Sequence, residues 1–83
     1  MQKTILITGG TGSLGQALTQ RLLQMDVRAI RIFSRNESKQ IEMENAIKDD
    51  RIRFFLGDVR DLQRLTRATE DVDLVFHAAA LKH

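Results

Sequence analysis

The chain has 83 residues, 42% of them hydrophobic and 29% charged, which suits one small globular domain spanning residues 1–83. Its formal charge is only +2, and the basic residues are spread along the chain, so charge gives no indication of nucleic-acid binding. No cysteine is present, which excludes disulfides and thiolate metal sites. No run approaches the roughly 20 apolar residues that span a bilayer, and the N-terminus lacks the apolar stretch of a signal peptide. We therefore expect a cytoplasmic protein with no membrane segment in this chain.

Short apolar runs alternate with helical patterns along the whole chain. The runs predict strands at Thr4–Thr8, Ala29–Phe33, Ile52–Leu56 and Leu74–Phe76. Helices are predicted over Ser13–Met25, over Glu37–Lys48, and in a short segment that follows Asp61 as N-cap. Their core-facing stripes are expected to be Leu14, Ala17, Leu18 and Leu22 in the first helix, Ile41, Ala46 and Ile47 in the second, and Leu62, Leu65 and Ala68 in the third.

Repeated strand–helix–strand units with apolar strands imply parallel pairing and right-handed crossovers. The predicted fold class is α/β, a Rossmann-type doubly wound parallel sheet, of which the chain holds the N-terminal part. It should have four strands in the order 3-2-1-4 and three helices. The fourth strand would be an unprotected edge, so we expect the isolated chain to self-associate through that edge.

Three glycines follow the first predicted strand at a spacing of three residues: Gly9, Gly12 and Gly15. A strand, a glycine turn and a helix N-terminus together form a site for a pyrophosphate. In this interpretation Gly9 makes the turn, Gly12 lets the backbone approach the phosphates, and Gly15 brings the helix close to the strand. Further contacts are expected from Thr11, Ser13 and Leu14. Glycines that serve turn geometry alone remain the alternative. A P-loop is excluded, because Gln16 and Ala17 follow Gly15 where that motif has Lys and Ser or Thr.

The end of the second predicted strand bears on the choice of cofactor. A site that prefers NAD places an acidic residue there to bind the ribose 2′-hydroxyl, but this chain has Ser34, Arg35 and Asn36. Arg35 can form a charge-assisted fork with a 2′-phosphate and stack on adenine, with Ser34, Asn36 and Lys39 nearby. NADP is therefore favoured over NAD. The alternative is a solvent-exposed helix entry with Asn36 as its cap.

Two further segments lie at the carboxyl ends of predicted strands. After the third strand, Asp58 can accept the adenine amino group while Val59 lies against the ring; a role for Asp58 or Asp61 as a helix cap is the alternative. After the fourth strand, small residues would let a cofactor ribose lie against the backbone: Ala78, Ala79 and Ala80. Lys82 could then reach a diphosphate or the substrate. The two histidines lack partners at ligand spacing, so no metal site is predicted.

These motifs together resemble the extended short-chain dehydrogenase/reductase superfamily. The block from Ile5 to Gly15 is typical of the superfamily. The segments 33–37, 55–61 and especially 75–83, which ends Ala-Ala-Ala-Leu-Lys-His, are similar to its polysaccharide-biosynthesis branch, which includes UDP-N-acetylglucosamine 4,6-dehydratases. The resemblance covers essentially this whole chain but only the N-terminal quarter or so of such an enzyme, without its substrate domain.

The resemblance implies a tightly held NADP and a UDP-sugar substrate. The family takes a hydride from C4, allows elimination of water across C5–C6 and returns the hydride to C6. Its substrate lysine corresponds to Lys82, and its cofactor residues correspond to Gly9, Thr11, Gly12, Ser13, Leu14, Gly15, Ser34, Arg35, Asp58, Val59, Ala78 and Ala79. The family's catalytic Tyr-x-x-x-Lys pair has no counterpart, because the chain contains no tyrosine. We therefore assign no catalytic residue and expect no turnover by this chain alone. A UDP-sugar 4-epimerase and a non-catalytic NADP-binding module remain the alternatives.

Overall fold

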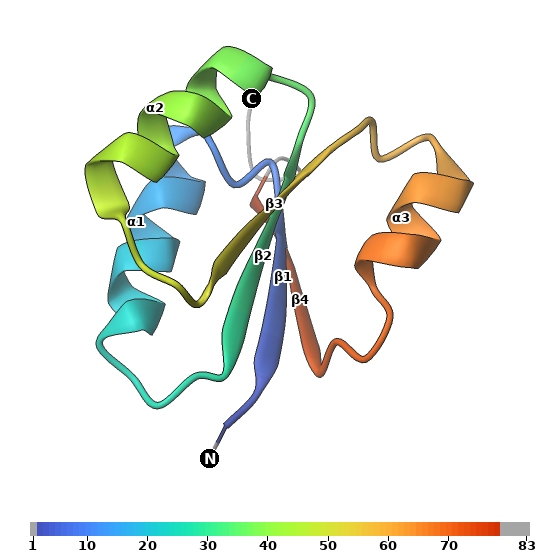
Figure 1. The fold of residues 1–83 in the computed structure, drawn as a ribbon. Coiled ribbons are helices and arrows are strands. Elements are labelled where there is room, and N and C mark those ends of the chain that lie inside the picture. The colour runs from blue at the N-terminus through green and yellow to red at the C-terminus, as the bar shows by residue number, and fades with distance from the viewer. Residues whose placement is uncertain (1, 79–83) are drawn as a thin grey trace.

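The computed structural model describes residues 2–78, which form a parallel sheet covered by helices on both faces (Figure 1). The elements in chain order are β1 (Thr4–Thr8), α1 (Ser13–Leu23), β2 (Ala29–Ser34), α2 (Glu37–Ile47), β3 (Ile52–Leu56), α3 (Leu62–Ala68) and β4 (Leu74–His77). All strand pairs are parallel, and the order across the sheet is β3-β2-β1-β4. The predicted Rossmann-type arrangement of four strands and three helices is confirmed.

The predicted element bounds differ from the structure at a few ends. The first helix stops at Leu23 rather than Met25, and the second stops at Ile47, because Lys48 takes a left-handed conformation with φ 44°. Strand β2 extends one residue further than predicted, to Ser34, and β4 extends to His77. The chain leaves both strands at the carboxyl edge of the sheet, where the candidate site residues follow.

Two apolar clusters form the core, one on each face of the sheet. On the face covered by α1 and α2, β1 and β2 contribute Ile5, Ile7, Ile30 and Ile32, which pack with Leu22 of α1 and Met43 of α2. On the other face, Leu6 and Phe33 pack against Ala68 of α3. Because side chains of a strand alternate between faces, the central strand β1 is buried along its whole length. The glycine loop follows directly from this buried strand.

The predicted core-facing stripes of the helices are partly wrong. In α1, Leu14 is 47% exposed and Ala17 is also exposed, while the buried positions are Gly15, Thr19 and Leu22. Thr19 can be buried because its hydroxyl donates to the backbone oxygen of Gly15 at 2.8 Å. The small Gly15 and the internally bonded Thr19 let this face of α1 approach the sheet, which turns Leu14 toward solvent.

The other two helices also bury positions that the apolar pattern did not indicate. In α2, Ile41 and Ala46 are exposed, and the buried residues are Gln40 and Met43. In α3, Leu65 and Ala68 face the core as predicted, but Leu62 is 73% exposed. Leu62 is the first residue of α3, so it lies beside the N-cap rather than over the sheet.

Strand β4 lies at an edge of the sheet, as the predicted order requires. Within residues 2–78 it pairs only with β1, and Leu74, Val75 and Phe76 are 38–44% exposed. An edge strand with exposed apolar side chains is a template for pairing with another chain. Self-association through β4 stays a prediction.

Candidate dinucleotide-binding cleft

A cleft of about 460 Å³ lies at the carboxyl edge of the sheet. Three segments line it: the glycine loop after β1, the end of β2 with the start of α2, and the loop after β3. Backbone hydrogen bonds join these segments, because Gly9 N donates to Phe33 O at 2.8 Å and Gly57 N donates to Ser34 O at 2.8 Å. The strand order therefore brings together segments that are some two dozen residues apart in the sequence.

Each glycine of the loop has a different structural requirement. Gly9 has φ 68°, a left-handed conformation that favours glycine. A Cβ on Gly15 would lie 2.4 Å from the Cα of Gly10, so α1 packs directly on the loop backbone. Gly10 follows the end of β1 by two residues, so this contact lies in the turn beside the strand that Gly15 was predicted to approach. A Cβ on Gly12 would meet only the Gly9 oxygen at 3.6 Å, which leaves the space above Gly12 open toward the cleft.

Helix α1 begins at the cleft without a side-chain cap. Gly12 is its N-cap residue, makes no capping hydrogen bond, and no acidic residue follows in the first turn. By contrast, Asn36 accepts from Lys39 N at 3.0 Å to cap α2, and Asp61 accepts from Arg64 N at 3.3 Å to cap α3. The first N–H groups of a helix have no partner within the helix and carry a partial positive charge. The start of α1 is therefore suited to an anion.

The end of β2 presents one buried and one exposed polar side chain. The Ser34 hydroxyl accepts from Gln40 Nε2 at 3.0 Å, and the same Gln40 nitrogen donates to Phe55 O at 3.0 Å. Gln40 thus fastens α2 to the ends of β2 and β3. Arg35 lies next to Ser34, with 73% of its side chain exposed at the cleft.

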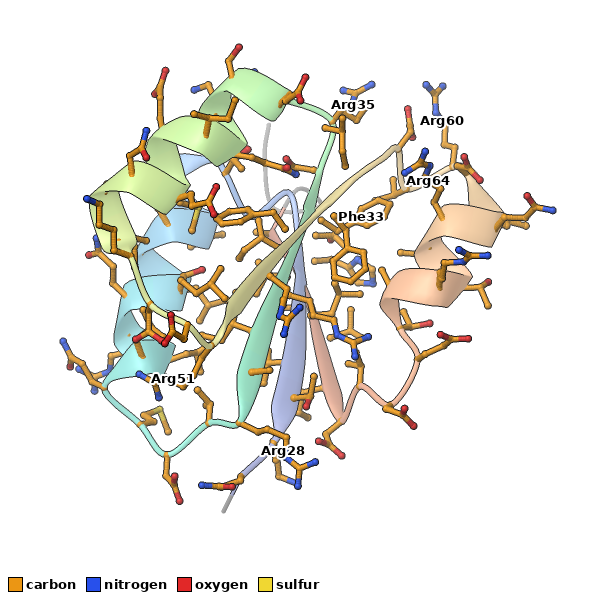
Figure 2. The ribbon with its side chains drawn as sticks, viewed as in Figure 1. Arg28, Phe33, Arg35, Arg51, Arg60 and Arg64 are labelled. Carbon is orange, nitrogen blue, oxygen red and sulfur yellow. The ribbon has the colours of Figure 1, made fainter. Side chains whose placement is uncertain are left out.

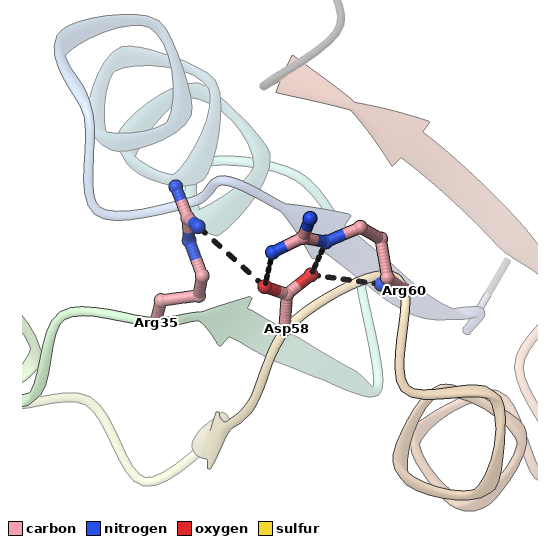
Figure 3. A network of polar contacts seen from close by, with 3 residues as sticks. All are labelled: Arg35, Asp58 and Arg60. Atoms are coloured by element: carbon pink, nitrogen blue, oxygen red, sulfur yellow. Dashed lines mark hydrogen bonds and ion pairs between the residues drawn. The ribbon is translucent and has the colours of Figure 1, made fainter.

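Asp58 joins Arg35 and Arg60 in one polar network (Figure 3). Its Oδ1 accepts from Arg60 N at 2.9 Å and from Arg60 Nε at 3.2 Å, and its Oδ2 accepts from Arg60 Nη2 at 2.9 Å. Arg35 Nη1 lies 3.5 Å from the same Oδ2. The hydrogen bonds from Arg60 hold the pKa of the Asp58 carboxyl well below its usual range, so this group is a carboxylate at neutral pH.

The cleft gathers candidates that the sequence placed in three separate segments. Those lining it are Gly9, Thr11, Gly12, Ser34, Arg35, Asn36, Lys39, Asp58 and Val59. Three other candidates are in the first turn of α1 and do not line the cleft: Ser13, Leu14 and Gly15. Ala78 is 5% exposed, and its side chain packs in the core with Ile5 and Ile7. Ala79, Ala80 and Lys82 lie outside the described residues.

Three lining residues were not predicted: Phe33, Gly57 and Arg60. A Cβ on Gly57 would lie 2.9 Å from the Phe33 ring, so these two residues pack closely. The sequence signal for this contact was a glycine placed directly after a predicted strand. For Arg60 the signal was its position two residues after Asp58, which suits a local side-chain pair. Figure 2 shows Arg35 and Arg60 at the same end of the sheet, with Arg28 at the opposite end.

Comparison with known proteins identifies the family. A family model described as polysaccharide biosynthesis protein matches residues 5–83. The chain belongs to this family. The resemblance to extended short-chain dehydrogenases/reductases of the polysaccharide-biosynthesis type is thereby confirmed.

Curated relatives of the family are much longer than this chain. It is 53% identical over 81 residues to the uncharacterized membrane protein MJ1061 of Methanocaldococcus jannaschii, covering 98% of the chain and 24% of that protein. It is 51% identical over 86 residues to the UDP-glucose 4-epimerase of Rickettsia bellii, covering 99% of the chain and 25% of the epimerase. The chain therefore spans about a quarter of the length of these two relatives. Among residues 2–78, no helix is long and apolar enough to cross a membrane.

Solved structures share the fold. The structure of Pen from Bacillus thuringiensis matches with a TM-score of 0.90 and 40% identity over 98% of this chain and 26% of that one. A short-chain dehydrogenase/reductase of Veillonella parvula in complex with NADP matches at 0.76 and 28% identity, over 93% and 35% of the two chains. WbmF of Bordetella bronchiseptica in complex with NAD+ and UDP matches at 0.74 and 26% identity, over 90% and 22%.

Proposed function

We propose that residues 1–83 form the N-terminal part of a dinucleotide-binding domain, with the cofactor in the cleft at the carboxyl edge of the sheet. The observation that carries this proposal is the open space above Gly12, next to the uncapped start of α1. A pyrophosphate fits there, because backbone N–H groups and the helix dipole both favour a negative group. Complexes of family-like folds with NADP and with NAD+ support a nicotinamide cofactor.

The finer proposal is that the cofactor is NADP. The two residues directly after β2, Arg35 and Asn36, are not acidic, so no carboxylate stands at the strand end to bind a ribose 2′-hydroxyl, and Glu37 at the start of α2 is not part of the cleft lining. The exposed Arg35 guanidinium offers two parallel N–H donors, and Lys39 adds a second positive charge to the cleft. Asn36 already caps α2, so we assign it that role first.

When bound, a nicotinamide cofactor supplies a reversible hydride acceptor. The residues of this chain are proposed to bind the cofactor and to orient it. The glycine loop and the start of α1 hold the pyrophosphate, and Arg35 holds the 2′-phosphate. Asp58 and Val59 border the adenine end of the cleft. The ribose is proposed to lie against the backbone at Ala78, Ala79 and Ala80. No residue of this chain is proposed as an acid or base of the reaction.

The proposed substrate of the larger protein is a UDP-sugar, with Lys82 near its diphosphate. Inversion of a C4 carbinol and elimination of water across C5–C6 both require prior oxidation at C4, so a hydride-accepting domain serves either reaction. We propose a 4,6-dehydratase acting on UDP-N-acetylglucosamine, because the segment 75–83, which ends Ala-Ala-Ala-Leu-Lys-His, is similar to that branch of the family. A UDP-sugar 4-epimerase is the second candidate, because relatives at 48–51% identity carry that name.

Two measurements test this proposal. Titration calorimetry of the 83-residue chain with NADP and NAD should show binding of both and tighter binding of NADP; equal affinities would contradict the preference for NADP. Turnover of UDP-N-acetylglucosamine by the full gene product, followed by proton NMR, separates the two reactions. A 4-keto-6-deoxy product supports the dehydratase, and a C4 epimer supports the epimerase. Loss of both signals with binding intact would favour a non-catalytic NADP-binding module.

A further inference from the structure

The Asp58 carboxylate is shared unequally by two arginines from different segments. Arg60 engages both carboxylate oxygens with its side chain, at 2.9 and 3.2 Å, whereas Arg35 approaches one oxygen at 3.5 Å (Figure 3). A bidentate arginine–carboxylate pair is the stronger arrangement. Asp58 is therefore held mainly by Arg60, and the guanidinium of Arg35 stays largely available.

This unequal sharing decides how far Arg35 is available to a ribose 2′-phosphate, given the NADP binding by Arg35 proposed above. A carboxylate beside Arg35 competes with a phosphate for the same N–H donors and repels its charge. If Asp58 lacked the Arg60 side chain, its carboxylate would be free to pair closely with Arg35. Both effects would weaken the 2′-phosphate site, whereas any change at the adenine or the pyrophosphate would affect NADP and NAD alike.

We propose that Arg60 is a specificity-determining positioning residue: by engaging Asp58 it leaves Arg35 free to bind a ribose 2′-phosphate. Arg60 acts through Asp58 and not by contact with the phosphate. The preference of the cleft for NADP over NAD thus depends on a residue outside the β2 end, in the loop after β3.

The local backbone does not require the Arg60 side chain. Its guanidinium lies on the surface, with 82% of the side chain exposed. The backbone N–H of Arg60 donates to Asp58, and Asp61 N donates to Asp58 O at 2.9 Å, so the turn keeps both bonds in a side-chain variant. Asp61 caps α3 independently. Arg60→Gln should therefore fold normally, which thermal melting verifies.

The test is the ratio of the NAD and NADP dissociation constants, measured by calorimetry on the 83-residue chain. Arg60→Gln should lower the preference for NADP by about two- to fivefold, the range expected for an exposed charge pair. Asp58→Asn should raise the preference, because it removes the competing carboxylate. In the Asp58→Asn background, adding Arg60→Gln should change the ratio no further. Arg28→Gln is the matched control, since it removes one charge at the opposite end of the sheet (Figure 2).

The outcomes separate this inference from the proposed function. If the unsubstituted chain binds neither dinucleotide, or binds both equally, the proposed function fails. If it prefers NADP and Arg60→Gln keeps the full preference, only the role of Arg60 is refuted. A loss that persists in the Asp58→Asn background would mean that Arg60 contacts the phosphate itself, which also overturns the inference.

Discussion

A methyl group added at Gly12 and one added at Gly15 should have opposite consequences. The two glycines are three residues apart at the start of α1, and both belong to the same sequence motif. At Gly12 the new Cβ would point into the open cleft, with its nearest neighbour 3.6 Å away. At Gly15 it would lie 2.4 Å from the Cα of Gly10. Gly12→Ala should therefore impair binding and spare the fold, and Gly15→Ala should impair the fold.

The expected magnitudes follow from the local geometry. Gly12 has φ −75° and ψ 176°, which any residue adopts. The loss of a glycine N-cap and the lower entropy of the unfolded chain roughly cancel, so Gly12→Ala should change the free energy of unfolding by less than about 0.5 kcal/mol. Gly15→Ala gains about 1 kcal/mol of helix propensity but forces backbone apart at a cost of about 3 kcal/mol or more. Its net loss of about 2 kcal/mol lowers the melting temperature by about 8–16 °C in a domain of this size.

Thermal melting and calorimetry of both variants provide the assay. Gly12→Ala should have the same melting temperature as the unsubstituted chain. It should bind both NADP and NAD at least about tenfold more weakly, because both contain the pyrophosphate. The ratio of the two affinities should stay constant, unlike in the variants of Arg60. Unchanged affinity in Gly12→Ala would refute the pyrophosphate site above this residue. Unchanged melting of Gly15→Ala would refute the close contact between α1 and the loop.

Three other predictions concern charge, helix orientation and the sheet edge. Arg35→Ala should weaken NADP binding by about tenfold and leave NAD binding within about twofold, because only NADP offers the phosphate; parallel losses for both in calorimetry would argue against that contact. Gln40→Ala should lower the free energy of unfolding by about 1–3 kcal/mol in urea, and Ile41→Ala by less than about 0.5 kcal/mol; the reverse order would contradict the orientation of α2. Val75→Lys should reduce self-association in sedimentation velocity, because a charge on an edge strand opposes pairing, and a chain that is already monomeric at high concentration would remove the basis for this prediction.

The strands and their order could be predicted because each signal is local and strong. Apolar runs of three to five residues, separated by helical segments, leave the parallel α/β sheet as the consistent arrangement. The glycine turn was equally clear, and Gly9 has the positive φ expected of it. The N-cap predicted at Asp61 is confirmed, and Asn36 also caps its helix, as the alternative interpretation of that residue had it.

The helix faces were harder to predict because hydrophobicity is a poor measure of contact at close packing distances. Thr19 and Gln40 are buried because their polar atoms have partners: Thr19 donates to the Gly15 oxygen within α1, and Gln40 donates to Ser34 on β2. Leu14 and Ile41 were assigned to the core on apolar character alone, yet both are about half exposed. A buried polar residue is stable only when its partners are in place, and the partners of Gln40 lie on β2 and β3. Such information is absent from the periodicity of a single helix.

The charge of the candidate site also could not be predicted from the composition, because it depends on which segments the fold brings together. The whole chain has a formal charge of only +2, which by itself indicates no anionic ligand. The cleft, however, collects three cationic side chains and one carboxylate: Arg35, Lys39, Arg60 and Asp58. Since the carboxylate is engaged mainly by Arg60, two positive groups remain for an anion. The folding of three loops onto one edge thus gathers at the cleft a positive charge that the composition of the whole chain does not reveal, and the proposed preference for a phosphorylated ribose rests on this local charge.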